Sequence, residues 1–323
     1  MILPSIFLFI NNYIIIAFIV GFVLIIYYAM SFYVYKMLMI NYNKPPVNLV
    51  DHTEDFYKES YQWFQEVPKE DVFVNSYDSL KLHGYYIPSY NKKSNNLAIV
   101  VHGYQSKATD MIIIGKMYSE MGFQVILTDL RGHGESEGSF TSFGYYEKYD
   151  LKKWINFANR TYGADIKILI HGVSMGAAST MMVTGLDIPK NVKFLLIDSG
   201  FTYVKKTFTK ANRSKGLKIF YFGLNIISYL RHKFTFYQIR PIKYMKRNII
   251  PFLLVIGEED RVVPVSMGNE LLHSSPATVK DMLVVPGSKH AQGFRADYKL
   301  CYDKLLKNIK PIFNIKKIYE SNN

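Results

Sequence analysis

The sequence contains a single cysteine, Cys301, among its 323 residues. One cysteine cannot form an intramolecular disulfide or supply a cysteine-rich metal site. We therefore expect no such cross-link, which fits a reducing compartment. A disordered chain is excluded as well, because 49% of the residues are hydrophobic and the length is ample for a buried core.

Charged side chains are absent before Lys36. This segment contains an apolar run at residues 13–35, and a helix of that length would be about 35 Å long, enough to cross the hydrocarbon core of a bilayer. Four tyrosines gather toward the end of the run, where an aromatic belt would lie: Tyr27, Tyr28, Tyr33 and Tyr35. A cleaved signal peptide is disfavoured, because no basic region precedes the run and the run is too long. The sequence thus predicts a transmembrane anchor over residues 1–36.

A polar segment with a Pro-Pro pair follows the anchor and predicts a juxtamembrane linker over residues 37–56. The main domain then takes up residues 57–323. Lys36 and Lys44 lie on the domain side of the span, so the positive-inside rule favours a cytoplasmic domain. The opposite orientation, with an extracytoplasmic domain, stays open.

Short apolar runs alternate with helical patterns along the main domain. Six runs are typical of buried strands: residues 96–103, 124–132, 166–172, 192–200, 251–260 and 281–287. Residues 71–88 add a hairpin with alternating apolar and polar positions. Strands that alternate with helices predict an α/β fold, with a mainly parallel, doubly wound sheet and helices on both of its faces.

Acidic residues are missing from Phe201 to Gly257, whereas twelve Lys and Arg lie between Lys205 and Arg247. This stretch is much longer than a usual connection between a strand and the next helix. We therefore predict an inserted helical cap at about residues 201–248. Within it, apolar residues three or four apart predict a helix whose apolar face packs over the sheet: Ile219, Phe222, Ile226 and Leu230.

Ser174 lies in the sequence HGVSMGAAST, directly after the strand-like run IKILI. Gly172 and Gly176 stand two positions to either side, which matches the pattern G-x-S-x-G of a strained turn between a strand and a helix. We expect the two glycine positions to approach each other so closely that a Cβ at either would clash. Such a turn exposes the serine oxygen at the carboxyl edge of the sheet, beside the N-terminal amides of the next helix. Ser174 is therefore a candidate nucleophile.

A serine hydroxyl needs a base, and the base needs a carboxylate that orients it. His290, in GSKHAQGF, and Asp260, in GEEDRVVP, each follow a strand-like run. The order Ser174, Asp260, His290 along the chain is the order expected for a Ser-His-Asp triad on this scaffold.

Other residues compete for these roles. Glu258 and Glu259, beside Asp260, and Asp198, at the end of another strand-like run, are alternatives for the acid. His133, in DLRGHGESEG, is an alternative for the base, although its glycine and charged neighbours favour a rigid polar turn.

Acyl transfer also needs donors for the oxyanion that develops in the transition state. The first predicted donor is the backbone N–H of Met175, directly after Ser174. The second is the N–H of Tyr104, because Gly103 lets the backbone turn there and His102 would shape the loop. The predicted site uses no cofactor and no metal ion.

With these motifs in order, the sequence resembles the α/β-hydrolase superfamily. The resemblance runs from about Phe73 to Lys307 and rests on HGYQS, DLRGHGESEG, GVSMGA, GEEDRVVP and GSKH. The chain is most similar to membrane-anchored bacterial hydrolases and to the esterase and serine-aminopeptidase-like branches, although it has HGYQS where several lipases and esterases carry HGGG. The resemblance implies an α/β-hydrolase fold and a Ser-His-Asp triad.

The predicted function is the hydrolysis of carboxylic esters with a lipophilic acyl group, because the aromatic-rich cap and the anchor would hold the site beside lipid. Two alternatives remain: a peptidase or amidase that uses the same triad, and a binding module without catalysis. The predicted partners are a small acyl-ester or peptide substrate and membrane lipid, which would meet the anchor and the basic cap. Nucleic acid is not predicted, because the sequence has no recognition motif for it.

Overall fold

A computed structural model describes residues 3–40, 55–91, 94–210 and 215–315. Within these ranges, eight strands form one sheet in the spatial order β1-β2-β4-β3-β5-β6-β7-β8. Its strands are β1 (Glu70–Asn75), β2 (Lys81–Ile87), β3 (Asn96–Val101), β4 (Gln124–Thr128), β5 (Lys167–Val173), β6 (Val192–Asp198), β7 (Phe252–Gly257) and β8 (Lys280–Val285). Only β2 runs against its neighbours β1 and β4, and every other pair is parallel.

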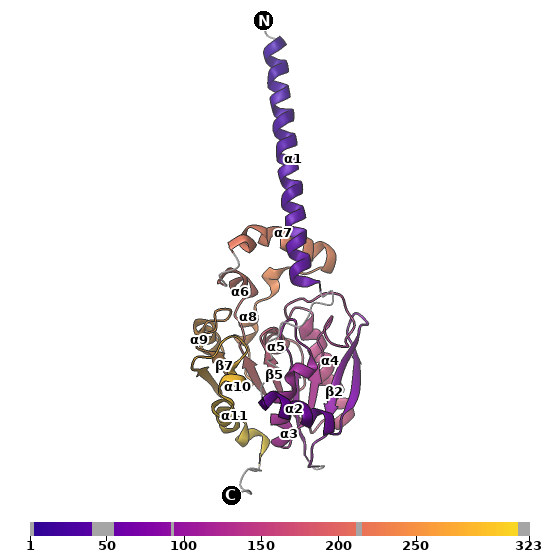
Figure 1. Ribbon diagram of the computed structural model, residues 1–323, viewed down its shortest axis with the longest axis vertical. Coiled ribbons are helices and arrows are strands. Elements are labelled where there is room, and N and C mark those ends of the chain that lie inside the picture. Colours follow the sequence, from indigo (N-terminus) through magenta and orange to yellow (C-terminus); the bar gives the residue numbers. More distant parts are fainter. Residues whose placement is uncertain (1–2, 41–54, 92–93, 211–214, 316–323) are drawn as a thin grey trace.

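Helices cover both faces of the sheet (Figure 1). One face carries α2 (Asp55–Glu66), α3 (Ile112–Glu120), α10 (Gly293–Ala296) and α11 (Tyr298–Phe313). The other carries α4 (Glu147–Tyr162), α5 (Met175–Val183), α8 (Pro241–Met245) and α9 (Val265–Ser274). A short 3-10 turn, η1 (Ala108–Met111), precedes α3.

The strand β3 explains why its sequence is continuously apolar. Leu97, Ile99 and Val101 pack into the core on the α5 side, whereas Ala98 and Val100 pack into the core on the α3 side. Successive side chains of a strand point to opposite faces, so a strand covered on both faces needs apolar residues at every position. The predicted fold, a mainly parallel doubly wound sheet with an inserted cap, is confirmed.

The cap lies between β6 and β7. It consists of α6 (Val204–Lys210), α7 (Lys215–His232), the 3-10 turn η2 (Phe236–Gln238) and α8. The predicted packing of α7 is wrong, because the stripe that was expected to face the sheet is exposed: Ile219 64%, Phe222 65%, Ile226 42% and Leu230 60%. A different stripe is buried, with Tyr221 6%, Leu224 1% and Ile227 2% exposed. The helix is apolar on more than one face, so periodicity alone cannot choose between them.

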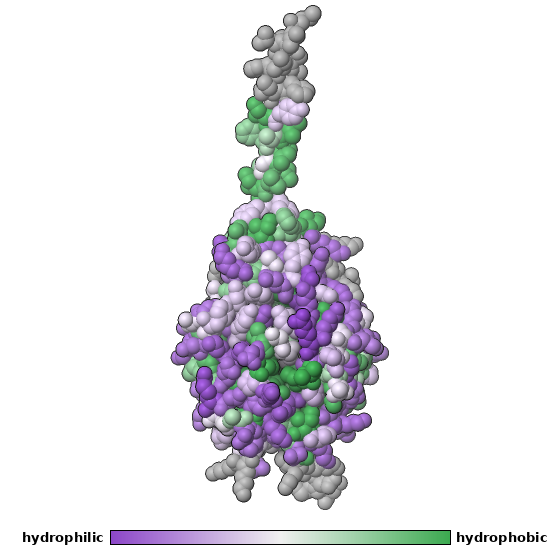
Figure 2. Space-filling view, turned by 180° about the vertical axis from the view of Figure 1, so that it is seen from behind, coloured by the Kyte–Doolittle hydropathy of each residue, from purple (hydrophilic) through white to green (hydrophobic). Residues whose placement is uncertain are grey.

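The N-terminal helix α1 (Leu3–Met39) projects from the body as a long rod, and its last turns lie beside α7 (Figure 1). Its segment Asn12–Met39 is long and apolar enough to cross a membrane. Apolar side chains cover much of the coloured part of the rod, and more of them lie on the body at the base of the rod (Figure 2).

The end of α1 is bonded to the cap. The hydroxyl of Tyr27 donates to the carbonyl of Ile219 at 3.0 Å and accepts from the N–H of Gly223 at 3.1 Å. A Cβ at Gly223 would lie 2.2 Å from Ser31 Oγ, so only glycine allows the two helices to come this close. The helix α1 and the cap therefore form one packed unit.

A half-buried histidine joins the same unit to the body. The ring of His232, the last residue of α7, stacks on Phe140 with centroids 3.7 Å apart, and its Nε2 lies 2.6 Å from Tyr35 Oη. Burial, with a smaller effect of Arg231, lowers the pKa of His232 to about 4. The ring is therefore neutral near pH 7 and accepts a hydrogen bond from the tyrosine.

The predicted boundary between an anchor ending at residue 36 and a linker over residues 37–56 is wrong at its first positions. The helix α1 continues to Met39, which is buried, and Ile40 forms a β-bridge with Phe140. Residues 41–54 of the predicted linker lie outside the described residues. The predicted aromatic belt is also reduced, because Tyr28 and Tyr33 are exposed but Tyr27 and Tyr35 contact the cap.

Candidate active site

Ser174 stands between β5 and α5, at the carboxyl edge of the sheet. Its backbone has φ 53° and ψ −106°, a conformation that a residue with a side chain adopts only under strain. A Cβ at Gly172 would lie 2.4 Å from Gly176 O, as the close approach of the two positions predicts. A Cβ at Gly176 would instead lie 2.2 Å from Val101 O, because the turn is wedged against the end of β3.

The structure brings the three predicted triad residues together. Ser174 Oγ lies 2.8 Å from His290 Nε2, and His290 Nδ1 lies 2.7 Å from Asp260 Oδ2. His290 follows β8 and Asp260 follows β7, so the two loops meet beside the turn that carries Ser174. The side chain of Asp260 is fully buried, whereas that of His290 is 20% exposed. Ser174 is also partly exposed, so a small molecule can reach its hydroxyl.

Asp260 is held in place by its own loop. Its Oδ1 accepts hydrogen bonds from Val262 N at 2.8 Å and Val263 N at 2.7 Å, while Oδ2 faces His290. Two backbone donors and the imidazole therefore satisfy the carboxylate, which compensates for its removal from water.

The alternative acids lie elsewhere. Glu258 and Glu259 are exposed, and Glu258 Oε2 accepts from Gly287 N at 3.0 Å. Asp198 is buried, and burial raises its pKa to about 7, against the opposing effects of a hydrogen bond from Ser199 and of His290. No hydrogen bond joins His290 to any of these three carboxyl groups within the described residues.

Ser199, which the sequence did not single out, supports the loop of His290. Its φ is 53°, its hydroxyl donates to Asp198 Oδ1 at 2.9 Å, and the same oxygen accepts from Ala291 N at 3.0 Å. Because Ala291 is the neighbour of His290, this contact ties the imidazole to the end of β6. A signal was present in the sequence, a Ser-Gly pair directly after a strand, but its partner lies 92 residues away.

We expect Ser199→Ala to lower kcat by about 10-fold with little change in KM, because the loop of His290 loses one anchor and misplacement of a base slows proton transfer. The measurement is steady-state kinetics on an activated ester. Ser274→Ala on α9, which removes a hydroxyl far from the triad, serves as the matched control. An unchanged kcat in Ser199→Ala, with His290 still in place, would contradict a positioning role.

The two predicted oxyanion donors are available. Within the described chain, the backbone N–H groups of Tyr104 and Met175 donate to no protein acceptor. The backbone turns directly after Gly103, where Ser106 N donates to Gly103 O at 3.4 Å, although Gly103 itself does not have a positive φ. A Cβ there would lie 3.4 Å from Ser174 Cβ and from Val173 O, an ordinary van der Waals contact, so the loop packs directly against the serine.

His102 fixes the shape of this loop, as its position predicts. Its Nδ1 donates to Gly103 O at 2.7 Å, and its Nε2 accepts from Leu130 N at 3.0 Å. Burial lowers the pKa of His102 to about 3, so the ring is neutral and can act as donor at one nitrogen and acceptor at the other.

Comparison with known proteins identifies the scaffold. Residues 92–226 match the family described as serine aminopeptidase, S33. YqkD of Bacillus subtilis is 22% identical over 279 residues, which cover 84% of this chain and 90% of YqkD. YfhR of Escherichia coli K12 is 25% identical over 234 residues, which cover 70% of this chain and 74% of YfhR.

Solved structures agree at the level of the fold. The Pyrococcus furiosus esterase Pf2001 superposes with a TM-score of 0.64 at 21% identity, covering 85% of this chain and 98% of the esterase. Est1E of Butyrivibrio proteoclasticus, solved with ferulic acid, gives a TM-score of 0.58 at 17% identity and covers 74% of this chain and 99% of Est1E. The chain therefore has the α/β-hydrolase fold. These similarities support a serine hydrolase in general, with esters and peptides both open as substrates.

His133 of this α/β hydrolase is not placed to act as the base. Its Nδ1 donates to Arg131 O at 2.9 Å, and its Nε2 accepts from Gln105 N at 3.3 Å. Arg131 beside it is buried and makes two-pronged ion pairs with Asp150 and Asp78. The segment therefore forms the rigid polar turn that its composition favours.

A second carboxylate–histidine cluster lies in the hairpin. His83 is buried, with Nδ1 2.7 Å from Asp129 Oδ2 and Nε2 2.9 Å from Asp71 Oδ1. Ligand atoms of Asp71, His83 and Glu135 lie within 4.8 Å of one another, as in a metal site. Both ring nitrogens already face carboxylates, however, and an imidazolium that donates twice fits this arrangement better than a metal ligand, which needs a free lone pair.

His83 links stability to pH. Burial alone would lower its pKa, but the hydrogen bonds to Asp129 and Asp71 outweigh burial and raise the pKa above its usual value of 6.5. A raised pKa in the folded state stabilises the fold below pH 6.5, and this contribution is lost as the pH rises through the folded-state value.

We therefore expect His83→Gln to lower the free energy of unfolding by about 2–3 kcal/mol at pH 5.5, and by less at pH 8. Urea unfolding of both proteins at the two pH values measures the difference. His273→Gln, on the exposed end of α9, is the control and should show no such trend. A difference that grows with pH would rule out the charged imidazole.

Proposed function

We propose that this α/β hydrolase cleaves carboxylic esters of lipophilic acyl groups through Ser174, His290 and Asp260. The observation that carries the proposal is the continuous pair of short contacts, 2.8 Å from Ser174 Oγ to His290 Nε2 and 2.7 Å from His290 Nδ1 to Asp260 Oδ2. A hydroxyl, an imidazole and a buried carboxylate in this order are what acyl transfer requires.

The proposed reaction has two steps. His290 takes the proton of Ser174 as the serine oxygen attacks the acyl carbon, and it gives that proton to the departing alcohol. Water then attacks the acyl-enzyme, with His290 again as the base. Asp260 keeps Nδ1 protonated and stabilises the imidazolium, while the N–H groups of Tyr104 and Met175 are the proposed donors to the oxyanion.

A lipophilic acyl group is favoured by the surroundings of the site. The hydroxyl of Tyr104 donates to Leu38 O at 2.8 Å, so the proposed oxyanion loop touches the end of α1. Phe143 stacks on Tyr104 with centroids 5.2 Å apart, and Phe236 of the cap packs on Phe143. Phe143 and Phe236 are buried, so aromatic side chains pack directly behind the proposed oxyanion loop, and such surroundings favour apolar substrates.

A peptidase or amidase is the second candidate, because residues 92–226 match a family described as serine aminopeptidase. The full chain in detergent would be assayed with p-nitrophenyl esters of two to twelve acyl carbons and with aminoacyl p-nitroanilides. The ester proposal expects kcat/KM to rise with acyl length and to exceed that for every anilide. A higher kcat/KM for an aminoacyl anilide would replace it with the peptidase.

We also propose that α1 crosses a bilayer, with the exposed stripe of α7 at the surface of that bilayer. The stripe comprises Ile219, Phe222, Ile226, Tyr229 and Leu230 of α7, the helix that packs against the end of α1 (Figure 1). Lys218, Arg231 and Lys233 flank it and are exposed, and each cation near an anionic leaflet contributes about 1 kcal/mol. This proposal replaces the predicted packing of the stripe on the sheet.

Spin labels test the membrane contact. In a Cys301→Ser background, a label at Phe222→Cys in nanodiscs is expected to relax with oxygen more than with a water-soluble nickel complex. A label at Tyr61→Cys, exposed on α2, should show the reverse. Equal nickel accessibility at both positions would exclude a lipid contact for α7. Thiol labelling of the second variant in intact cells reports the orientation, for which a cytoplasmic domain is proposed.

A further inference from the structure

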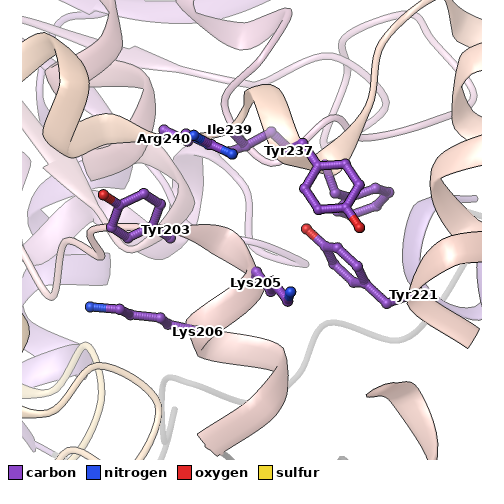
Figure 3. A pocket seen from close by; sticks show the side chains of 8 residues that line it. Tyr203, Lys205, Lys206, Tyr221, Tyr237, Ile239 and Arg240 are labelled. Carbon is purple, nitrogen blue, oxygen red and sulfur yellow. The ribbon is translucent and has the colours of Figure 1, made fainter. Parts of the chain in front are cut away.

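The cap contains a cavity of about 220 Å³ that lies outside the triad. Residues of α6, α7, η2 and the segment after η2 line it (Figure 3): Tyr203, Lys205, Lys206, Tyr221, Phe236, Tyr237, Ile239 and Arg240. Three of these side chains are cationic and none is acidic. The volume is below that of sites for drug-sized ligands, about 300–1,000 Å³, so the cavity suits a small group rather than a whole molecule.

Two of the three cations have no counter-ion. Lys206 Nζ lies 2.8 Å from both carboxylate oxygens of Glu270 on α9. Lys205 and Arg240, in contrast, make no ion pair with any residue in the described ranges. The surrounding sequence offers no partner either, since Asp and Glu are absent from residues 201–257.

Aromatic faces hold these cations at the cavity. The ammonium of Lys205 lies 5.4 Å from the ring centre of Tyr221 and 5.9 Å from that of Tyr237. The guanidinium of Arg240 lies 5.9 Å from the ring centre of Tyr203. A ring face attracts a cation without neutralising its charge, so both groups can still bind an anion.

Tyr221 supplies an independent sign of a ligand. The residue is 6% exposed, and its hydroxyl has no hydrogen-bond partner among the described residues. The amide of Asn225 donates at 2.6 Å to the Tyr221 carbonyl, and it lies near enough to the hydroxyl to oppose the rise of the Tyr221 pKa that burial causes. A buried hydroxyl without a partner is costly, and such groups are rare in folded proteins. Figure 3 shows this hydroxyl turned toward the hydroxyl of Tyr237, beside Lys205.

We propose that this cavity binds the phosphate group of an anionic ligand. A phosphate monoester carries a charge of about −1.5 to −2 at pH 7 and three acceptor oxygens. Lys205 and Arg240 match that charge, and the hydroxyls of Tyr221 and Tyr237 can donate to the remaining oxygens. A carboxylate would leave one of the two cations without a partner. The ligand is either a soluble phosphate ester or the headgroup of a lipid, since α7 lines the cavity and also carries the exposed apolar stripe.

Calorimetric titration of the full-length protein tests the proposal, with inorganic phosphate in one arm and nanodiscs in the other. The nanodiscs contain zwitterionic lipid, with or without phosphatidic acid. We expect saturable binding with an apparent Kd about 10-fold weaker in Lys205→Gln and in Arg240→Gln. Tyr221→Phe, which keeps the ring, should weaken it about 3- to 5-fold, since only one neutral hydrogen bond is lost. Tighter binding of the phosphatidic acid nanodiscs than of inorganic phosphate identifies a headgroup, and the reverse identifies a soluble ester.

Two controls make the result specific. Lys246→Gln removes a cation of the cap that does not line the cavity, and it should leave Kd unchanged. Lys206→Gln should weaken binding less than Lys205→Gln, because Glu270 already pairs with Lys206. Absence of saturable phosphate binding, or an equal loss in Lys246→Gln, overturns the proposal in favour of general charge attraction. Circular dichroism and thermal unfolding show that each variant is folded, so this outcome is independent of the proposed hydrolase reaction.

Discussion

Ser174→Ala is expected to lower kcat on an activated ester by about 10⁴–10⁶, because no other side chain can form the acyl-enzyme. The same substitution should abolish labelling by a fluorophosphonate, which reacts with an activated serine. Stopped assays of turnover and a gel of the labelled protein measure both effects. Some rate above that in water should remain, since the proposed oxyanion donors and the binding surfaces stay in place.

The strained backbone at Ser174 makes the fold of this variant an essential control. Alanine at φ 53° keeps the same backbone strain as serine, so the unfolding transition should move little. Ser274→Ala on α9 should retain full activity and labelling. If folded Ser174→Ala kept its turnover, Ser174 could not be the nucleophile and the proposed function would be excluded. The fold assignment would still hold.

The sheet was predictable because its signals are local. A strand covered on both faces must be apolar at every position, so the runs that became β3, β5 and β7 stand out in the sequence. The turn around Ser174 was equally readable, because the pattern of two glycines reflects contacts within a few residues and with one neighbouring strand.

The contacts that support the site could not be read from the sequence. The hydroxyl of Ser199 accepts from Ala291 N, 92 residues away, and neither residue type predicts the other. The close approach of Gly223 to Ser31 likewise appears only once α1 and α7 are packed. On α7, amphipathic periodicity identified a helix but selected the wrong face, because the exposed stripe is as apolar as the buried one.

Position in the sequence identified the orienting carboxylate only in part. Asp260, Glu258 and Glu259 are adjacent, and loop position favoured Asp260 without excluding the other two. The fold separates them, because the carboxyl group of Asp260 turns inward to two backbone amides and His290, whereas both glutamates are exposed. A direct test of this assignment is available.

Asp260→Asn is expected to lower kcat by about 10⁴, the scale reported for the equivalent change in a serine protease. Asparagine keeps the size of the side chain, and its carbonyl can still accept from Val262 N and Val263 N. Its NH₂ group then faces His290 Nδ1, which must become an acceptor. The imidazole proton moves to Nε2, and that nitrogen can no longer take the proton of Ser174.

Amide substitutions at the three alternative acids are the controls for the effect of Asp260→Asn on kcat. Glu258→Gln and Glu259→Gln, measured on the same ester, should each change kcat by less than about 3-fold, because neither exposed carboxylate contacts the imidazole. Asp198→Asn replaces a carboxyl group that makes no hydrogen bond to His290 and whose pKa, raised to about 7 by burial, leaves it partly neutral near pH 7, and we expect a loss well below that of Asp260→Asn. If one of these three variants lost as much activity as Asp260→Asn, the orienting carboxylate would have to be reassigned.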